Sequence, residues 1–168
     1  FSVMRSSRCA AATLRRAFEN PAYGLRTAAN GYLLFERGLS DQDDLAQLAL
    51  ADPIEIPYTR TADLGDAIRY RGFGLSATDV RPGEVFFLTH YWESLAPLAE
   101  PYWLFTGYPG GQRFEQAVFG LYPVDEWQPG DIVRHEQALS LPRLPDGDDY
   151  ELVAGLWYDS GELQLRSA

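Results

Sequence analysis

Two histidines are the first residues to examine for chemistry, because imidazole is both a metal ligand and an acid–base group near neutral pH. His90 lies in the run L-T-H-Y-W, and His135 is followed directly by Glu136. A functional interpretation joins these three residues into a metal or acid–base cluster. We favour a simpler one, because no third ligand has a helpful spacing. In it, His90 is a hydrogen-bonded core residue and His135 lies on a solvated strand face.

Clustered carboxylates are the second candidate, because calcium prefers oxygen ligands on turns. One group, Asp41, Asp43 and Asp44, precedes a helix-like stretch, and its simpler role is at a helix N-terminus. The other surrounds Gly147, is more typical of a β-turn, and consists of Asp146, Asp148 and Asp149. Neither group fits the EF-hand loop pattern, so the second remains a weak metal candidate. We predict no cofactor.

No catalytic motif is recognisable elsewhere. The sequence contains no G-x-S-x-G nucleophile elbow. The glycine-rich stretch 107–111 lacks the Lys-Ser/Thr of a phosphate loop and leads into a strand. Cys9 is the single cysteine and has no obvious histidine partner. We therefore predict no catalytic residues, and a chain that is not an enzyme by itself.

Aromatic residues are the feature with the clearest binding potential, because Trp and Tyr rings exposed on a β-sheet can stack on the C–H faces of sugars. Strand alternation assigns Trp92 to the core and directs Tyr91 and Trp103 outward. The alternative is that most of these rings simply fill the core. The ligand-binding candidates are Tyr91, Trp103, Tyr108 and Trp127.

Composition limits the class of partner. The chain has 168 residues with 46% hydrophobic and 14% aromatic content, which is typical of a folded domain. The net charge of −10 argues against nucleic acid as the main partner, since its phosphates repel an acidic surface. No apolar run reaches the length of a membrane span.

The stretch 81–129 organises the chain. Aromatic-rich runs of strand length alternate with Pro/Gly punctuation, which is typical of consecutive antiparallel strands. On the run 86–92 we expect Phe86, Leu88, His90 and Trp92 to share one face. Further strands are predicted at 67–75, 102–106, 113–119, 132–141, 150–158 and 163–166. This spacing predicts a mainly β fold, an antiparallel two-sheet β-sandwich of Ig-like or jelly-roll-like type.

The N-terminal part has a different pattern. A short strand at 1–5 is followed by a helix at 10–19, in which Leu14 and Phe18 share a face, and Pro21 then prevents its continuation. Asn30-Gly31 between two strand-like runs predicts a hairpin. We therefore divide the chain into a β-α-β-β appendage at 1–40, a connector with a short helix at 41–62, and the sandwich at 63–168.

Several motifs together resemble a known kind of domain. The upstream ones are Asn20-Pro21-x-Tyr23-Gly24 and Ala29-Asn30-Gly31-Tyr32-Leu33-Leu34-x-x-Arg37-Gly38. The others are Pro82-Gly83-Glu84, Tyr91-Trp92, Phe105, Tyr122-Pro123, Trp127, Pro129-Gly130-Asp131, Leu141-Pro142, Asp146-Gly147, Tyr150 and Gly155-Leu156. The pattern is similar to the C-terminal β-sandwich of bacterial polytopic membrane proteins of the glycosyltransferase-C type. That class is dolichyl-phosphate-mannose mannosyltransferase-like, and the upstream motifs also resemble an uncharacterised predicted membrane-protein family. His90 departs from the pattern, which usually has an aliphatic residue there.

The resemblance implies an extracytoplasmic, membrane-associated module beside a lipid-linked-sugar transferase. The catalytic loops of such transferases are absent from this chain, so no catalytic residue carries over. We expect a non-catalytic accessory module that binds a glycan or lipid-linked sugar, or positions an acceptor. The alternative is a structural domain that docks onto a membrane protein portion or a neighbouring subunit. Exposed aromatics would favour binding, whereas an unpaired strand edge or a flat apolar patch would favour docking.

Overall fold

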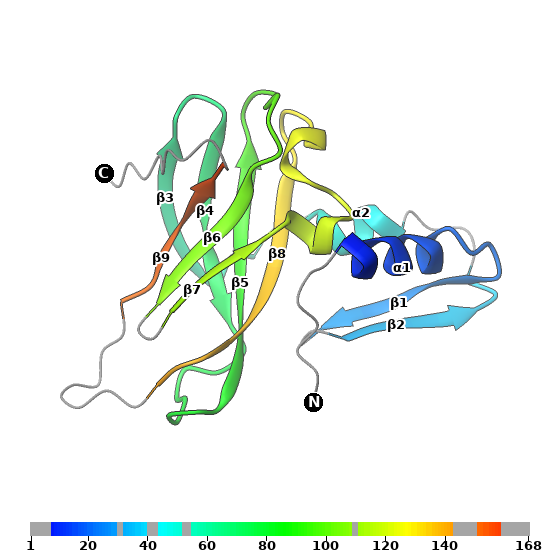
Figure 1. Cartoon of the computed structure of the whole chain (residues 1–168), viewed down its shortest axis with the longest axis horizontal. Coiled ribbons are helices and arrows are strands. Elements are labelled where there is room, and N and C mark those ends of the chain that lie inside the picture. The colour runs from blue at the N-terminus through cyan, green and yellow to red at the C-terminus, as the bar shows by residue number, and fades with distance from the viewer. Residues whose placement is uncertain are drawn as a thin grey trace.

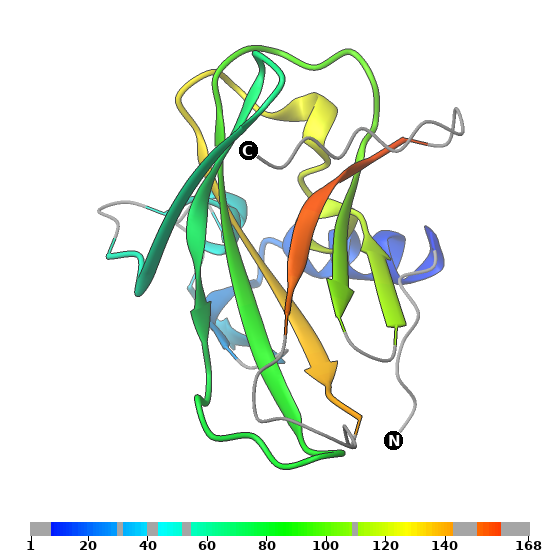
Figure 2. The ribbon, with the colours of Figure 1, turned by 90° about the vertical axis from the view of Figure 1, so that its left-hand side faces the viewer.

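Two antiparallel sheets face each other in the computed structural model, which describes residues 8–29, 32–39, 44–51, 55–108, 111–142 and 151–158. The larger sheet has the order β3-β4-β5-β8 and the smaller one β7-β6-β9. Figure 2 shows them as two layers. The larger sheet comprises Tyr58–Leu64, Ile68–Leu75, Val85–Ser94 and Ile132–Ser140. The smaller comprises Gly111–Glu115, Trp103–Tyr108 and Val153–Trp157. The β-sandwich prediction is confirmed.

A hairpin and a helix form the N-terminal appendage. Strands β1 (Tyr23–Ala29) and β2 (Tyr32–Arg37) form a two-stranded sheet in the described part of the chain, and α1 (Arg8–Phe18) lies alongside it (Figure 1). The Phe18 ring meets Phe35 edge-on at 5.1 Å, so the predicted apolar helix face is confirmed. The strand expected at 1–5 lies outside the described residues, as does the one at 163–166.

A short helix, α2 (Asp44–Ala49), joins the appendage to the sandwich. Its end bridges to β8 through Leu50 and Val133. Leu25 of β1 and Leu48 of α2 belong to the same apolar cluster as Trp92 of the sandwich. Burial of apolar surface therefore fixes the appendage against the β8 side of the larger sheet.

Strand β5 has strict alternation of buried and partly exposed residues. Phe86, Leu88, His90 and Trp92 are buried, as the sequence predicts. On the outer face, Arg69 pairs with Asp63 at 2.6 Å and Arg71 with Glu93 at 2.9 Å.

One predicted strand is wrong in its second half. We expected a strand over 113–119, but β7 ends at Glu115 and a 3-10 turn, η1, spans Ala117–Gly120. Val118 and Phe119 there have φ of 50° and 59°. The left-handed backbone cannot continue a strand, although Val and Phe are good strand formers.

The motif Y-P-x-x-x-W-x-P-G-D builds one turn, which contains a second 3-10 element, η2 (Val124–Glu126). The Asp131 carboxylate accepts hydrogen bonds from the Tyr122 hydroxyl and from the Gln128 backbone N–H. The Trp127 indole donates to the Tyr122 carbonyl at 3.0 Å. Burial, followed by this bond to Asp131, raises the pKa of Tyr122 to about 12. The motif residues therefore stabilise the loop that leads into β8.

Gly72 is a position where the fold requires glycine. Its φ is +139°, and an added Cβ would lie 2.2 Å from the Tyr58 carbonyl oxygen. We expect Gly72→Ala to lower the free energy of unfolding by about 1–3 kcal/mol, because it adds both strain and a backbone clash. Chemical denaturation measures this loss. Gly74→Ala is the matched control: it lies two residues along the same strand, and its nearest contact is 3.4 Å. Equal losses in the two variants would contradict this role for Gly72.

Candidate functional site

A belt of polar side chains crosses the middle of the sandwich, between two apolar clusters. Trp92 and Val133 belong to the larger cluster, and Leu88 and Leu139 to the smaller. The residues between them on the same strands are polar and point inward. These residues, His90, His135 and Gln137, meet polar side chains from three other strands, Tyr70 of β4, Thr106 of β6 and Glu115 of β7. We call the six residues the polar belt.

In the belt, each hydrogen bond is donated toward the next residue in the order Tyr70, His90, Thr106, Gln137. Thr106 donates its only hydroxyl proton to Gln137 Oε1 at 2.6 Å, so it must accept from His90 Nε2 at 3.0 Å. His90 Nδ1 is then the acceptor for the Tyr70 hydroxyl, at 3.0 Å. Burial, and next the neighbouring His135, lower the pKa of His90 to about 3. His90 is therefore a neutral, hydrogen-bonded core residue, as expected.

His135 is placed differently from the prediction. We expected a solvated strand face, but the side chain is 1% exposed and lies on the inward face of β8 with Val133, Gln137 and Leu139. His135 and Gln137 interrupt the apolar alternation of β8. The sequence pattern therefore does not identify which face of this strand points inward. The His135 and Glu136 side chains therefore point to opposite faces of β8 and cannot form one cluster.

His135 connects the belt to a carboxylate. Its Nε2 lies 3.4 Å from Glu115 Oε2, and Glu115 Oε1 is 2.5 Å from Arg113 Nε. Burial raises the pKa of Glu115, but the hydrogen bonds and charges of His135 and Arg113 outweigh it and leave the pKa below its ordinary value. Glu115 is thus an ionised carboxylate inside the sandwich edge. Among the described residues, no group of His, Cys, Asp and Glu side chains could hold a metal ion.

A pocket of about 150 Å³ lies on the outer face of β5 and β8, opposite the polar belt. Two directly opposed pairs form its base, Thr89 with Glu136 and Tyr91 with Arg134. The walls come from three other segments, the hairpin β1–β2, helix α2 and the turn η1. They contribute Ala28, Tyr32, Leu33, Leu48, Val118 and Phe119.

The pocket has a buried side and an open side. Leu48 and Val118 are 6% and 2% exposed, whereas Tyr32 is 74% exposed and therefore lies at the rim. Arg134 donates to the Leu48 carbonyl at 3.2 Å, which ties the polar base to α2. A cavity of this volume accepts a single ring of about the size of benzene. The pocket thus offers aromatic rings, hydroxyl groups and two opposite charges to a small ligand.

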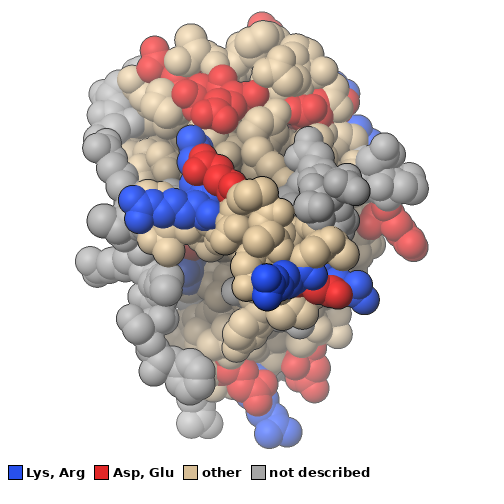
Figure 3. Space-filling view, turned by 90° about the vertical axis from the view of Figure 1, so that its right-hand side faces the viewer, with Lys and Arg blue, Asp and Glu red and all other residues tan. Residues whose placement is uncertain are grey.

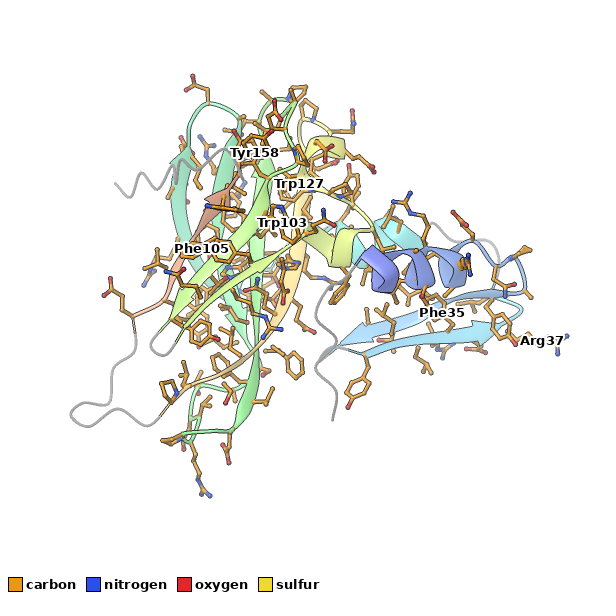
Figure 4. The ribbon with its side chains drawn as sticks, viewed as in Figure 1. Phe35, Arg37, Trp103, Phe105, Trp127 and Tyr158 are labelled. Atoms are coloured by element: carbon orange, nitrogen blue, oxygen red, sulfur yellow. The ribbon has the colours of Figure 1, made fainter. Side chains whose placement is uncertain are left out.

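The sequence-predicted binding residues are not brought together. Tyr91 lines the pocket, whereas Trp103 pairs with Trp157 in the smaller sheet and Tyr108 packs on the smaller apolar cluster. Trp127 is 2% exposed, so its indole presents no face to a ligand. Figure 4 shows Trp103 and Trp127 within the sandwich, away from Phe35 of the hairpin. Asp146, Asp148 and Asp149 lie outside the described residues.

Sequence reasoning missed Tyr32, Thr89 and Arg134, and it considered Glu136 only for a metal or acid–base cluster. The one signal was the alternation of β5, which directs Thr89 outward with Tyr91. The β8 register and the hairpin position have no local signal. Seen from the N-terminal side, basic and acidic side chains are interspersed across the middle of the molecule (Figure 3). The pocket likewise contains one basic and one acidic residue, Arg134 and Glu136.

No protein-family model, curated protein or solved structure matches the chain. None of the helices in the described segments is long and apolar enough to cross a membrane.

The pH dependence of stability tests the burial of His90. Its pKa falls from 6.5 to about 3 on folding, so the unfolded chain binds one more proton between these values. Stability is therefore lost as the pH falls through this window, with a His90 contribution that approaches about 1.4 kcal/mol per pH unit. We expect His90→Gln, which cannot titrate, to remove this slope. Urea denaturation of both proteins at pH 7, 5.5 and 4.5 measures it, and parallel stability curves would contradict the assignment.

Proposed function

We propose that the chain is a non-catalytic binding module whose pocket over β5 and β8 takes one sugar unit of a glycan or lipid-linked sugar. The observation that carries this proposal is the composition of the pocket: Tyr91 and Tyr32 contribute rings, while Thr89, Arg134 and Glu136 contribute polar groups. A sugar ring combines apolar C–H faces with a rim of hydroxyls, and so matches both kinds of group.

The cellular setting belongs to the same proposal and is supported by the sequence resemblance alone. We propose that the module is extracytoplasmic and serves a membrane glycosyltransferase-like protein, where it binds a glycan or positions an acceptor. Transferase chemistry would then lie in another part of that system. The acidic chain, with net charge −10, suits an uncharged sugar unit in the pocket better than the polyanionic backbone of a nucleic acid.

A second candidate, docking onto a membrane protein or a neighbouring subunit, is favoured by a different observation. On β2, Tyr32 and Leu34 point away from α1 and are 74% and 57% exposed, beside a strand edge that no described strand pairs with. Such an edge accepts an added strand from a partner. Tyr32 belongs to both surfaces, so the experiment on binding must separate them.

Substitution of Tyr91 separates the two candidates. We expect saturation-transfer NMR to detect binding of at least one probe from a panel of glucose, mannose, N-acetylglucosamine and a short-chain polyprenyl-phosphate mannose. Tyr91→Ala should weaken that binding about tenfold, because a stacked ring contributes about 0.5–1.5 kcal/mol beyond its area. Tyr91→Phe, which keeps the ring, should retain most of it.

Tyr58→Ala is the matched control. Tyr58 is an exposed tyrosine on β3 of the same sheet, stacked on Phe73, and is not among the residues that line the pocket. This variant should bind as the parent does. No saturation transfer to any probe, or equal losses in the two alanine variants, would reject the sugar pocket and leave docking as the function to pursue.

A further inference from the structure

One wall of the pocket is a turn in an unfavourable backbone conformation. Val118 has φ 50° and ψ 45°, and Phe119 has φ 59° and ψ 22°, both in the left-handed region. In this region the Cβ of a non-glycine residue lies too close to the backbone, and a β-branched residue there is a marked outlier. Strain of this kind persists only where surrounding contacts hold it. Both residues line the pocket, so whatever holds the turn also shapes the binding site.

The contact that holds the turn comes from the polar belt. The backbone N–H of Val118 donates to His135 Nδ1 at 3.2 Å. The turn is closed by the Leu121 N–H, which donates to the Val118 carbonyl at 3.0 Å, and the Phe119 ring lies 6.5 Å from the imidazole. His135 sits between Arg134 and Glu136 in the chain, whose side chains line the pocket from the other face of β8. One residue thus joins the buried interior to the pocket wall.

This bond requires the neutral form of His135. Because Nδ1 accepts from Val118, the ring proton is on Nε2, the atom that faces Glu115. A second proton would convert Nδ1 from an acceptor into a donor and place it against the Val118 N–H. The hydrogen bond would then be lost, and the strained turn would have no anchor at this point.

The described charged and titratable groups around His135 are few. Strand β7 contributes Glu115 and Arg113, and β5 contributes His90, which directly opposes His135 in the sheet. Arg134 and Glu136 on β8 point to the opposite face, and η1 carries no titratable side chain. Glu115 is placed to accept from an imidazolium at Nε2, so the protonated form also has a partner. The site therefore has a partner for each form of His135: the Val118 N–H for the neutral imidazole and the Glu115 carboxylate for the imidazolium.

We propose that His135 is a positioning residue for the pocket: its neutral imidazole holds the Val118–Phe119 turn as a wall, and protonation releases the turn and weakens ligand binding. The regulation of binding rests on the function proposed above, whereas the link between His135 and the pocket wall does not.

A ligand-free NMR experiment tests the link on the intact chain. Side-chain ¹⁵N shifts report the tautomer of His135, and hydrogen exchange reports the Val118 amide. We expect the Nε2–H tautomer at pH 7.5 with a slowly exchanging Val118 amide. On acidification, three changes should share one midpoint. They are the protonation of His135, faster exchange of the Val118 amide after correction for the intrinsic rate, and shifts of the Ala28, Leu33 and Thr89 methyl groups in the pocket.

Three results would overturn the proposal: protonation of His135 without a change at Val118, a Val118 change at another midpoint, or a neutral His135 down to acid unfolding. His135→Asn supplies a variant that keeps the acceptor, since its Oδ1 replaces Nδ1, but does not titrate. It should hold the Val118 amide and the pocket methyl shifts constant with pH. His135→Leu, which removes the acceptor, should speed Val118 exchange roughly fivefold to tenfold at pH 7.5.

Binding of mannose and N-acetylglucosamine as probes then tests the regulation. The parent should bind more weakly at pH 5 than at pH 7.5, His135→Asn should lose this dependence, and His135→Leu should bind weakly at both. His90→Gln is the matched control, because His90 is equally buried on the opposing strand and its ring nitrogens bond to Tyr70 and Thr106 rather than to the turn. It should keep the parent profile. If neither sugar binds while the NMR midpoints coincide, the sugar function fails and the link between His135 and the pocket wall stands. If a sugar binds with the same pH dependence in the parent and in His135→Asn, the proposed regulation is rejected.

Discussion

The register between β5 and β8 is the constraint on which the rest of the structure depends. Nine consecutive residue pairs, from Val85 with Ser140 to Glu93 with Ile132, align without a shift. The inward face therefore carries the polar belt and its flanking apolar residues, and the outward face carries the base of the pocket. A slip of one residue would exchange the two faces. The belt and the pocket are consequently two sides of the same pairing.

The polar belt shows how this pairing is made specific. Polar groups in a core cost free energy unless each finds a partner, and the chain Tyr70–His90–Thr106–Gln137 supplies partners in one direction. The apolar clusters on either side supply the burial that drives the sheets together. The belt adds little net stability but penalises any register that separates its members. His135 extends this constraint out to η1, and so to the shape of the pocket.

Local patterns predicted much of the fold. Strict alternation in β5 identified its inward face, Asn30-Gly31 between strand-like runs identified the β1–β2 hairpin, and Leu14 with Phe18 identified the packed face of α1. Failure came where long-range contacts override local preference. Val118 and Phe119 are strand formers held in a left-handed turn, and the inward face of β8 contains two polar residues in place of apolar ones.

The candidate site was less predictable for the same reason. Tyr91 was found because alternation directs it outward, whereas Trp127 was assigned to a surface although its indole is used to close the loop before β8. The pocket joins Tyr32, Phe119 and Arg134, which lie far apart in the chain and meet only through tertiary packing. No spacing rule connects such residues.

The most direct test of the account is a chemical-shift map of the ¹⁵N-labelled protein titrated with mannose and N-acetylglucosamine at pH 7.5. The account predicts saturable shifts at Thr89, Tyr91, Arg134 and Glu136, together with Val118 and Phe119 on the opposite wall. Shifts that centre on Trp103 and Trp157 of the smaller sheet, or no saturable shifts with either sugar, would contradict a binding pocket built on the outer face of β5 and β8.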